Sequence, residues 1–294
     1  MPQLYEQPAL SFPAMTPRRA TDLVVGLDGH LLDPGAAVLH PDDPVLARGD
    51  GVFETVLVRH GRACLLDAHL SRLAASAATT GLPAPDVGRF RAAVDVAVRA
   101  WPDAEGMLRL LYGRATRGTV AFVTVSAVPD RVVAARRDGV SVVTLDAGHA
   151  VPGPWSVATA KSLSYGRFAA AQRQAERAGA SDAMLIRSDG NVLEGARSTV
   201  VVSPEPGVLL SPPLDSAILP GTTADALFDA ARRRGWRCEH GPLGIADLDA
   251  AQGLWLVSAV TLAARVHTLD GRPLRAAPAA ADVAYLVDLA VATD

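Results

Sequence analysis

A Gly/Pro-rich stretch near the middle of the chain, DAGHAVPGPW at residues 146–155, is the feature that most restricts how this sequence can fold. Clusters of glycine and proline mark turns and loops, and they interrupt helices and strands. Short apolar runs typical of strands, and longer stretches with helical periodicity, lie on both sides of this segment. We therefore expect two domains of mixed helix and sheet, divided at this point.

Four segments are expected along the chain. They are an irregular N-terminal arm at residues 1–20, a small α+β domain at 21–146, a linker at 147–155 and a larger domain at 156–294. In the small domain, GVFETVLVRHGRACLL predicts a hairpin, Asp67 is placed to cap the helix that follows, and GVSVVTL predicts the last strand. In the larger domain, GNVLEGARSTVVVS predicts a strand, and ILPGTT is a loop that opens directly into a helix.

Composition bounds the class of protein. The 294 residues carry a formal net charge of −3 and the pI is about 6.2, so the charge balance favours neither a nucleic acid nor an anionic membrane as partner. No apolar run reaches the roughly 18 residues that span a bilayer. Two cysteines, Cys64 and Cys238, lie far apart, which suits thiols in a reducing cytosol. The sequence therefore predicts a soluble, cytoplasmic protein with no membrane or nucleic-acid partner.

Lysine is nearly absent from the chain. Of 28 basic side chains, 27 are arginine and one is lysine, Lys161. Arginine keeps its proton in proteins and cannot form an imine, whereas a lysine amine can lose its proton and act as a nucleophile. Lys161 follows small and apolar residues in SVATAKSLSYG, at the end of an expected strand, where burial would lower its pKa. It is a candidate for amine chemistry, with a solvated loop residue as the alternative.

Three further positions carry groups suited to a charged cofactor. Gly221, Thr222 and Thr223 open a helix, where free backbone N–H groups can hold a phosphate, although an ordinary helix cap has the same pattern. Arg72 lies among apolar residues of a helix and can reach inward to a phosphate or outward to solvent. Glu194 lies in an apolar strand and needs a partner, for which one of the many arginines is the default.

Other chemistries find little support in the sequence. The seven histidines have no paired spacing and two distant cysteines cannot build a zinc site, so no metal is expected. The chain has no GxSxG elbow, Walker A loop or GxGxxG fingerprint. A single lysine, a buried carboxylate, an arginine and a Gly-Thr-Thr helix start together match the needs of pyridoxal 5′-phosphate, which we predict as the cofactor.

The chain resembles the class IV aminotransferases, the fold-type IV pyridoxal-phosphate enzymes, from about residue 22 to residue 294. Four segments carry the resemblance: RGDGVFETVLVRHGRACLLDAHLSRL (48–73), KSLSYGRFAAAQRQAERAGASDAMLIRSDGNVLEG (161–195), ILPGTT (218–223) and WLVSAVTLAARVHTLDG (255–271). It implies an α/β (α+β) fold with a smaller N-terminal α+β domain and a larger C-terminal β-rich domain with flanking helices. It also implies a homodimer that acts on a small-molecule substrate.

Roles for individual residues follow from the same resemblance. Lys161 would bind the cofactor covalently and carry the proton, and Glu194 would pair with its pyridine nitrogen. The remaining cofactor contacts that the resemblance implies are Arg72, Tyr165, Gly221, Thr222, Thr223, Ser258, Ala259 and Thr261. Arg109 and Arg114 are candidates for binding a substrate carboxylate, or for structural ion pairs.

Within the family, the text around FETVLVRHGRACLLDAHLSRL and LYGRATRG is most similar to actinobacterial aminodeoxychorismate lyases. We expect conversion of 4-amino-4-deoxychorismate to 4-aminobenzoate and pyruvate, a step of folate synthesis. The alternative is amino transfer from D-amino or branched-chain amino acids to a 2-oxo acid. The Arg-x-His of D-amino-acid aminotransferases is Arg114-Ala115-Thr116 here, and Ser164 and Ala224 also depart from the common family pattern.

Overall fold

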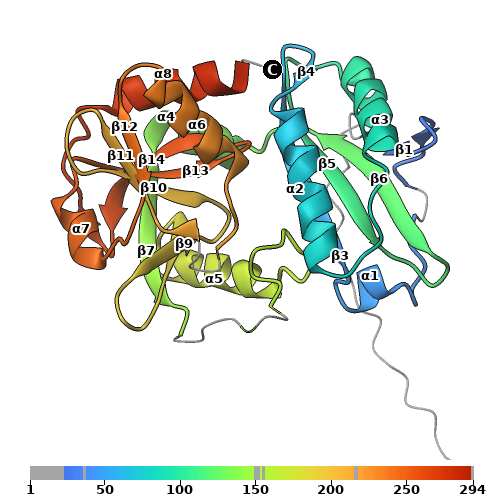
Figure 1. Cartoon of the computed structure of the whole chain (residues 1–294), viewed down its shortest axis with the longest axis horizontal. Coiled ribbons are helices and arrows are strands. Elements are labelled where there is room, and N and C mark those ends of the chain that lie inside the picture. The colour runs from blue at the N-terminus through green and yellow to red at the C-terminus, as the bar shows by residue number, and fades with distance from the viewer. Residues whose placement is uncertain (1–22, 36–37, 149–152, 154–155, 215–217, 293–294) are drawn as a thin grey trace, which may run out of the picture.

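The computed structural model describes residues 23–35, 38–148, 153, 156–214 and 218–292. Two sheets, each with its own helices, lie side by side (Figure 1). This mixture of helix and sheet in two parts is the fold class that the sequence predicted. The expected arm at residues 1–20 and most of the expected linker at 147–155 fall outside the described residues.

The N-terminal sheet contains six strands in the order β2-β1-β6-β5-β3-β4. The strands are β1 (Leu23–Gly26), β2 (Leu31–Leu32), β3 (Gly51–Arg59), β4 (Arg62–Ala63), β5 (Glu105–Arg114) and β6 (Thr119–Ser126), and their pairings are antiparallel. Helices α2 (Leu66–Thr79) and α3 (Val87–Ala100) pack their apolar sides on one face of this sheet. The short α1 (Pro44–Ala47) lies near β5.

The C-terminal sheet contains nine strands in the order β12-β11-β10-β13-β14-β7-β8-β9, with β15 paired to β14. The strands are β7 (Val140–Asp146), β8 (Asp182–Ile186), β9 (Val192–Gly195), β10 (Thr199–Ser203), β11 (Val208–Ser211), β12 (Arg237–His240), β13 (Gly253–Ser258), β14 (Leu262–Leu269) and β15 (Arg272–Pro273). The helices are α4 (Asp130–Asp138), α5 (Gly166–Arg177), α6 (Thr222–Arg232), α7 (Ile245–Ala250) and α8 (Ala280–Ala292). Helices α6 and α8 share one apolar cluster with the sheet, and α5 packs against β8 from another side.

The two faces of the N-terminal sheet have different surroundings, because side chains alternate along a strand. On β3, Val52 and Val56 belong to the apolar cluster under α2 and α3. Leu57 instead belongs to the cluster that contains Leu227 of α6. One face of this sheet is therefore covered by its own helices, and the other faces the C-terminal half of the molecule.

Three expectations about local structure were wrong. The run GVSVVTL, which we expected as the last strand of the small domain, is β7, and it pairs in parallel with β8 and β14 of the C-terminal sheet. An apolar run does not reveal which sheet a strand joins, so the change of sheet falls before Val140 and not at residue 146. Asp67, which we expected to cap the helix, lies instead inside the first turn of α2. The residue before the helix is Leu65, which has a left-handed backbone, φ 54°.

The third difference bears on function. GNVLEGARSTVVVS is not one strand but two, β9 and β10, which lie at separate places in the sheet. The chain bends between them, where the Gly195 N–H donates a hydrogen bond to the Ser198 carbonyl oxygen at 2.8 Å. Residues 196–198 therefore form a loop between strands.

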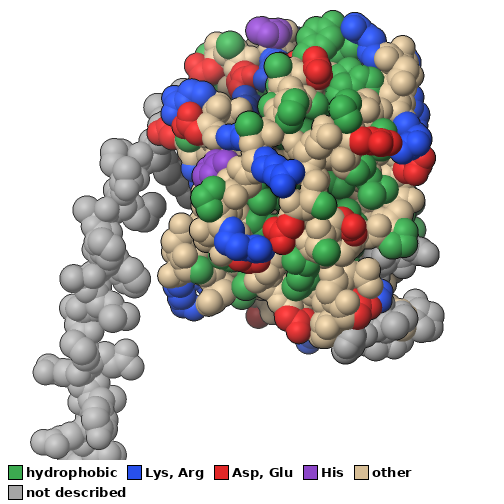
Figure 2. Space-filling model, turned by 90° about the vertical axis from the view of Figure 1, so that its left-hand side faces the viewer, with side chains coloured by type: hydrophobic (Ala, Val, Ile, Leu, Met, Phe, Trp, Pro, Cys, Tyr) green, Lys and Arg blue, Asp and Glu red, His purple; other side chains and the backbone are tan. Residues whose placement is uncertain are grey.

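The surface of the C-terminal half carries charges of both signs. On the side shown in Figure 2, arginine side chains alternate with acidic ones and with apolar patches. Among the described residues, no helix combines the length and apolarity needed to cross a bilayer, and no cluster of histidine, cysteine and carboxylate side chains is arranged to hold a metal ion.

Candidate active site

Lys161 lies in the connection between β7 and α5, and not at the end of a strand as we expected. The short β4 pairs only with the last residues of β3, which leaves the edge of the first residues of β3 free. Ser162, in the connection that contains Lys161, pairs with Val52 at this edge through an isolated bridge. The Phe53 N–H donates to the Lys161 carbonyl oxygen at 2.9 Å, and the Lys161 N–H donates to the Ser76 hydroxyl oxygen at 3.1 Å. The N-terminal domain therefore holds the backbone of Lys161 on both sides.

The amine of Lys161 lies between the two sheets. Its Nζ is 4.7 Å from the centre of the Phe53 ring, and the residue is half-buried. Burial, together with the positive charge of Arg72, lowers the pKa of Lys161 to about 8. A neutral, nucleophilic amine is thus accessible near neutral pH, and this environment favours amine chemistry over the alternative of a solvated loop lysine.

Glu194 is a half-buried carboxylate one residue before the end of β9. It accepts a hydrogen bond from the Leu219 N–H at 3.3 Å, and none of the described arginines forms an ion pair with it. Burial raises the pKa of Glu194 to about 7. The expected default, a salt bridge to arginine, is therefore absent among the described residues, and the carboxylate is suited to a cationic group brought in by a ligand.

The start of α6 forms a cradle with groups that have no partner. Gly221 precedes the first helical residue, and a Cβ there would meet Thr199 Oγ1 at 2.1 Å. The hydroxyl oxygens of Thr223 and Ser198 are buried without a hydrogen-bond partner among the described residues. Backbone N–H groups at a helix start, a close-approach glycine and unpartnered buried hydroxyls fit a phosphate group.

Arg72 lies beside this cradle. It extends from α2, and one terminal nitrogen, Nη1, donates to the Pro220 carbonyl oxygen at 2.6 Å, directly before Gly221. Its Nε and Nη2 donate to the two carboxylate oxygens of Glu54 at 2.8 and 2.7 Å. Its side chain is 13% exposed, so of the two orientations that the sequence left open, the inward one is observed.

The turn between β13 and β14 completes the cradle. Thr199 pairs with Val257, which places Ser258 near the start of β10. The Thr261 N–H donates to Ser258 Oγ at 3.4 Å, and Nε of Arg136, on α4, donates to the Val260 carbonyl oxygen at 2.9 Å. Ser258 is the last residue of β13, and Ala259 and Thr261 lie in the turn that follows it, beside the strand that leads from the Gly221 cradle.

Tyr165 lies close to Lys161. Its ring meets the Phe53 ring edge-on, with 5.6 Å between the ring centres, and its hydroxyl donates to the Ala196 carbonyl oxygen at 3.2 Å. Burial raises the pKa of Tyr165 to about 12, so the side chain stays neutral. It forms a wall of the site rather than an acid or base.

Arg109 and Arg114 lie on opposite faces of β5, since they are five residues apart on one strand. Arg109 pairs with Thr55 and shares the face of Phe53, and the positive charge of its exposed side chain contributes to the lowered pKa of Lys161. Arg114 donates to Asp50 Oδ2 at 2.9 Å and to the Gly81 carbonyl oxygen at 3.1 Å. Arg114 is therefore held in a structural ion pair, and Arg109 remains the candidate for a substrate carboxylate.

Comparisons with known proteins agree with this geometry. The family model described as amino-transferase class IV matches residues 51–269, which include Lys161, Glu194 and the Gly221 cradle. The chain belongs to the class IV aminotransferase family.

Individual members of this family match over nearly the whole chain. A bifunctional aminodeoxychorismate lyase / D-amino acid transaminase of Mycobacterium tuberculosis is 51% identical over 92% of this chain and 100% of its own length. The PLP-bound form of a hypothetical aminotransferase from M. tuberculosis is 52% identical, with a TM-score of 0.90 over 93% of this chain and 99% of that one. A fold IV-transaminase from Curtobacterium pusillum is 36% identical, with a TM-score of 0.82 over 92% and 98%.

The cofactor of this class IV aminotransferase is pyridoxal 5′-phosphate. The site has groups that fit that molecule: an amine of lowered pKa in Lys161, a half-buried carboxylate in Glu194 and the cradle at Gly221. Together with Arg72, these residues supply groups complementary to the aldehyde, the ring nitrogen and the phosphate.

Several residues of the site were missed in the sequence. Glu54 is buried beneath α2, beside His69 and Arg72 of that helix. Arg197 lies 3.7 Å from Asp182 and donates to Gln172 Oε1 at 3.0 Å. The phase of the strand GVFET, in which Glu54 falls with Val52 and Val56 on the buried face, is a signal that could have revealed Glu54. No comparable pattern marks Arg197, because the bend after β9 places it.

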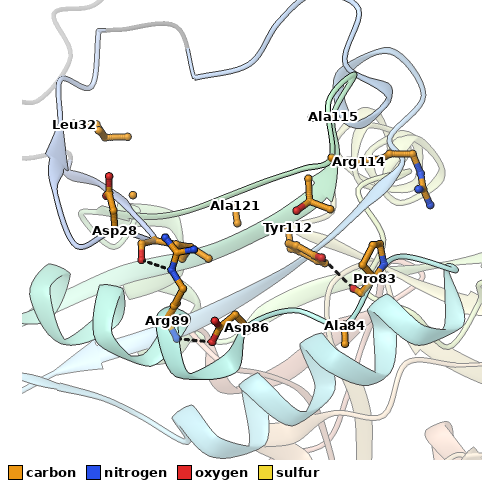
Figure 3. Close-up of a pocket in the computed structure, with 14 residues that line it drawn as sticks. Asp28, Leu32, Pro83, Ala84, Asp86, Arg89, Tyr112, Arg114, Ala115 and Ala121 are labelled. Carbon is orange, nitrogen blue, oxygen red and sulfur yellow. Dashed lines mark hydrogen bonds between the residues drawn. The ribbon is translucent and has the colours of Figure 1, made fainter.

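A hollow of about 840 Å³ in the N-terminal domain is separate from this site (Figure 3). It lies between the β1–β2 turn, the end of β5 and the loop before α3. Tyr112 donates to the Pro83 carbonyl oxygen within it, and Arg89 is held by Asp86 and the Leu27 carbonyl oxygen. Neither Lys161 nor a residue of the phosphate cradle lines it.

Proposed function

We propose that this enzyme is a 4-amino-4-deoxychorismate lyase, which releases 4-aminobenzoate and pyruvate for folate synthesis, and that D-amino-acid transamination is a second activity of the same site. The observation that carries the proposal is the 51% identity to the bifunctional M. tuberculosis enzyme over 92% of this chain. The transaminase part takes further support from a D-alanine aminotransferase of Bacillus licheniformis, 27% identical over 84% of this chain and 88% of its own length.

Charge around Lys161 supports a substrate with more than one carboxylate. Arg109 lies on the sheet face next to the amine, and Arg197 lies on the loop that Tyr165 contacts. Arg131, at the start of α4, has a pKa lowered by burial and then by the charge of Arg197, so these cations are close enough to repel. Aminodeoxychorismate has two carboxylates, and we propose that Arg109 binds one of them, with the help of this positive charge.

The protein's own groups perform the proton transfer. Bound pyridoxal phosphate supplies an electron sink for the bonding electrons that a proton leaves behind. Lys161, with a pKa near 8, takes the proton from the ring carbon that bears the substrate amine. Glu194 would hold positive charge at the cofactor ring nitrogen. The enolpyruvyl group departs and takes up a proton in place of the one that Lys161 removed, which gives pyruvate. This reaction requires no oxo acid as acceptor of the amino group.

The assay that tests the proposal supplies 4-amino-4-deoxychorismate alone and follows both products. We expect 4-aminobenzoate and pyruvate to form in equal amounts with no oxo acid present. A parallel reaction contains D-alanine and 2-oxoglutarate, and L-leucine replaces D-alanine in a third. Transamination without product from aminodeoxychorismate would refute the lyase and leave an aminotransferase.

We also propose that the enzyme is a cytoplasmic homodimer, from the family resemblance and from the two widely spaced cysteines. Light scattering on the purified holoenzyme should give twice the 30.6 kDa of the chain. A mass of one chain across the working concentration range would exclude the dimer.

A further inference from the structure

A buried carboxylate beneath α2 organises one side of the phosphate cradle. Glu54 is 0% exposed, although its strand neighbours on this face are valines. Its Oε1 accepts from Arg72 Nε, and its Oε2 accepts from Arg72 Nη2 and lies 2.7 Å from His69 Nδ1. Burial opposes the charge, but Arg72 and His69 outweigh it and lower the pKa of Glu54 to about 2. Glu54 is therefore an anion that fixes both side chains.

The hydrogen-bond inventory of Arg72 shows what remains for a ligand. A guanidinium has five N–H donors. Glu54 takes one on Nε and one on Nη2, and the Pro220 carbonyl oxygen takes one on Nη1. One N–H on each terminal nitrogen is left and can bind an anion. Glu54 thus fixes which N–H groups of Arg72 remain available to a phosphate.

His69 determines the direction of a second donor. It is 1% exposed, and burial lowers its pKa, so its ring is neutral. Because ionised Glu54 only accepts, the ring proton lies on Nδ1, and Nε2 has a free lone pair. Thr222 Oγ1 lies 3.5 Å from that nitrogen. The hydroxyl proton of Thr222 is therefore directed toward His69, whereas the buried hydroxyl of Thr223 has no partner among the described residues.

We propose that Glu54 and His69 are positioning residues of the phosphate site: Glu54 orients Arg72, and His69 engages Thr222, so that the hydroxyl contact to the phosphate comes from Thr223. The chain Glu54–His69–Thr222 links β3, α2 and α6. It joins the two domains at the point where the phosphate binds. The proposal concerns the cofactor alone and does not depend on which reaction the enzyme catalyses.

Paired titrations of the apoprotein with pyridoxal phosphate and with pyridoxal test the role of Glu54. Pyridoxal can join Lys161 but has no phosphate. We expect Glu54→Gln to weaken pyridoxal phosphate binding by about tenfold to a hundredfold, as the loss of a buried charged hydrogen bond does, and to leave the affinity for pyridoxal close to the wild-type value. The ³¹P signal of the bound cofactor should also shift in the variant.

Asp43→Asn is the matched control for this titration. Asp43 is also a buried carboxylate of the N-terminal domain, 6% exposed, but it bonds to Thr116, away from the cradle. We expect the control to lower the melting temperature without changing the ratio of the two affinities. If Glu54→Gln weakens pyridoxal and pyridoxal phosphate equally, the residue is only structural and the proposal is refuted.

Thr222→Val and Thr223→Val provide an independent test in which the buried charges stay in place. Each variant removes one hydroxyl and keeps the helix start. We expect Thr223→Val to weaken pyridoxal phosphate binding by about tenfold and to weaken pyridoxal binding much less. We expect Thr222→Val to weaken pyridoxal phosphate binding less than Thr223→Val does. A larger loss from Thr222→Val would show that its hydroxyl, and not that of Thr223, contacts the phosphate, and would overturn the assignment.

Discussion

Burial moves the pKa values of Lys161 and Glu194 toward each other, to about 8 and about 7. A lysine with a lowered pKa and a carboxylate with a raised pKa, close together, are typical of a binding or catalytic site. Lys161 could be predicted from the sequence because the chain has no second lysine. The strand phase could have marked Glu54 as buried, but its contact with Arg72 could not be assigned, because the two residues meet only through the packing of β3 against α2.

Replacement of Lys161 by alanine tests the covalent attachment. We expect purified wild-type enzyme to absorb in the visible through the cofactor linked to Lys161, and Lys161→Ala to lose that band and all activity. Absorption spectroscopy and circular dichroism of the same samples measure this, with unchanged circular dichroism showing that the fold persists. A visible band that survives the substitution would contradict the assignment, since the chain has no other lysine.

The stability of the apoprotein should reveal the raised pKa of Glu194. Between pH about 4.5 and about 7, folded apoprotein keeps a proton on Glu194 that the unfolded chain has released, so this group makes stability fall as pH rises through that window. Glu194→Gln removes the effect. Urea unfolding of both apoproteins across this range should show a difference in their free energies of unfolding that changes with pH. A constant difference would mean that Glu194 titrates normally.

At the scale of elements, the site depends on two loops whose positions a strand pattern does not reveal. The bend between β9 and β10 brings Ser198 and Thr199 to the Gly221 cradle, and the β7–α5 connection pairs with the edge of β3. The sequence predicted a strand at residues 190–203 but not that the chain turns within this segment. The glycine–threonine start of α6 was predicted correctly, because a helix N-terminus has a local signature.

Gly221→Ala tests the close packing of these elements. The added Cβ would meet Thr199 Oγ1 at 2.1 Å, so the start of α6 must shift away from β10. We expect an increase of about tenfold in the dissociation constant of pyridoxal phosphate, a typical cost of overpacking. The double variant Gly221→Ala/Thr199→Ala should recover part of the affinity that Gly221→Ala alone loses. Strictly additive effects would show that the two residues do not interact.

At the scale of the whole molecule, both domains contribute groups to the candidate cofactor site. Arg72 and the residues that hold the Lys161 backbone belong to the N-terminal domain, and Glu194 and the Gly221 cradle belong to the other. The sequence predicted two domains, but it assigned β7 to the wrong one, because an apolar strand is equally suited to either sheet. The boundary that matters for function is a surface where the two sheets face each other.

Removal of the cofactor should therefore weaken the molecule as a whole. A ligand present at about a hundred times its dissociation constant adds roughly 2.7 kcal/mol to the free energy of unfolding. We expect differential scanning calorimetry to show a melting temperature several degrees lower for the apoprotein, restored by pyridoxal phosphate and less fully by pyridoxal. Equal melting temperatures would mean that the cofactor does not hold the domains together.

The two hydrogen bonds that hold the Lys161 backbone, to Phe53 and to Ser76, have a consequence for refolding. Along the chain, both residues are separated from Lys161 by a large part of the small domain and by β7. Each sheet can assemble from its own strands, but this contact closes only after the two have met. The visible absorption of the cofactor linked to Lys161 then reports the final stage of refolding. This absorption should appear later than the far-ultraviolet circular dichroism signal of the helices and strands.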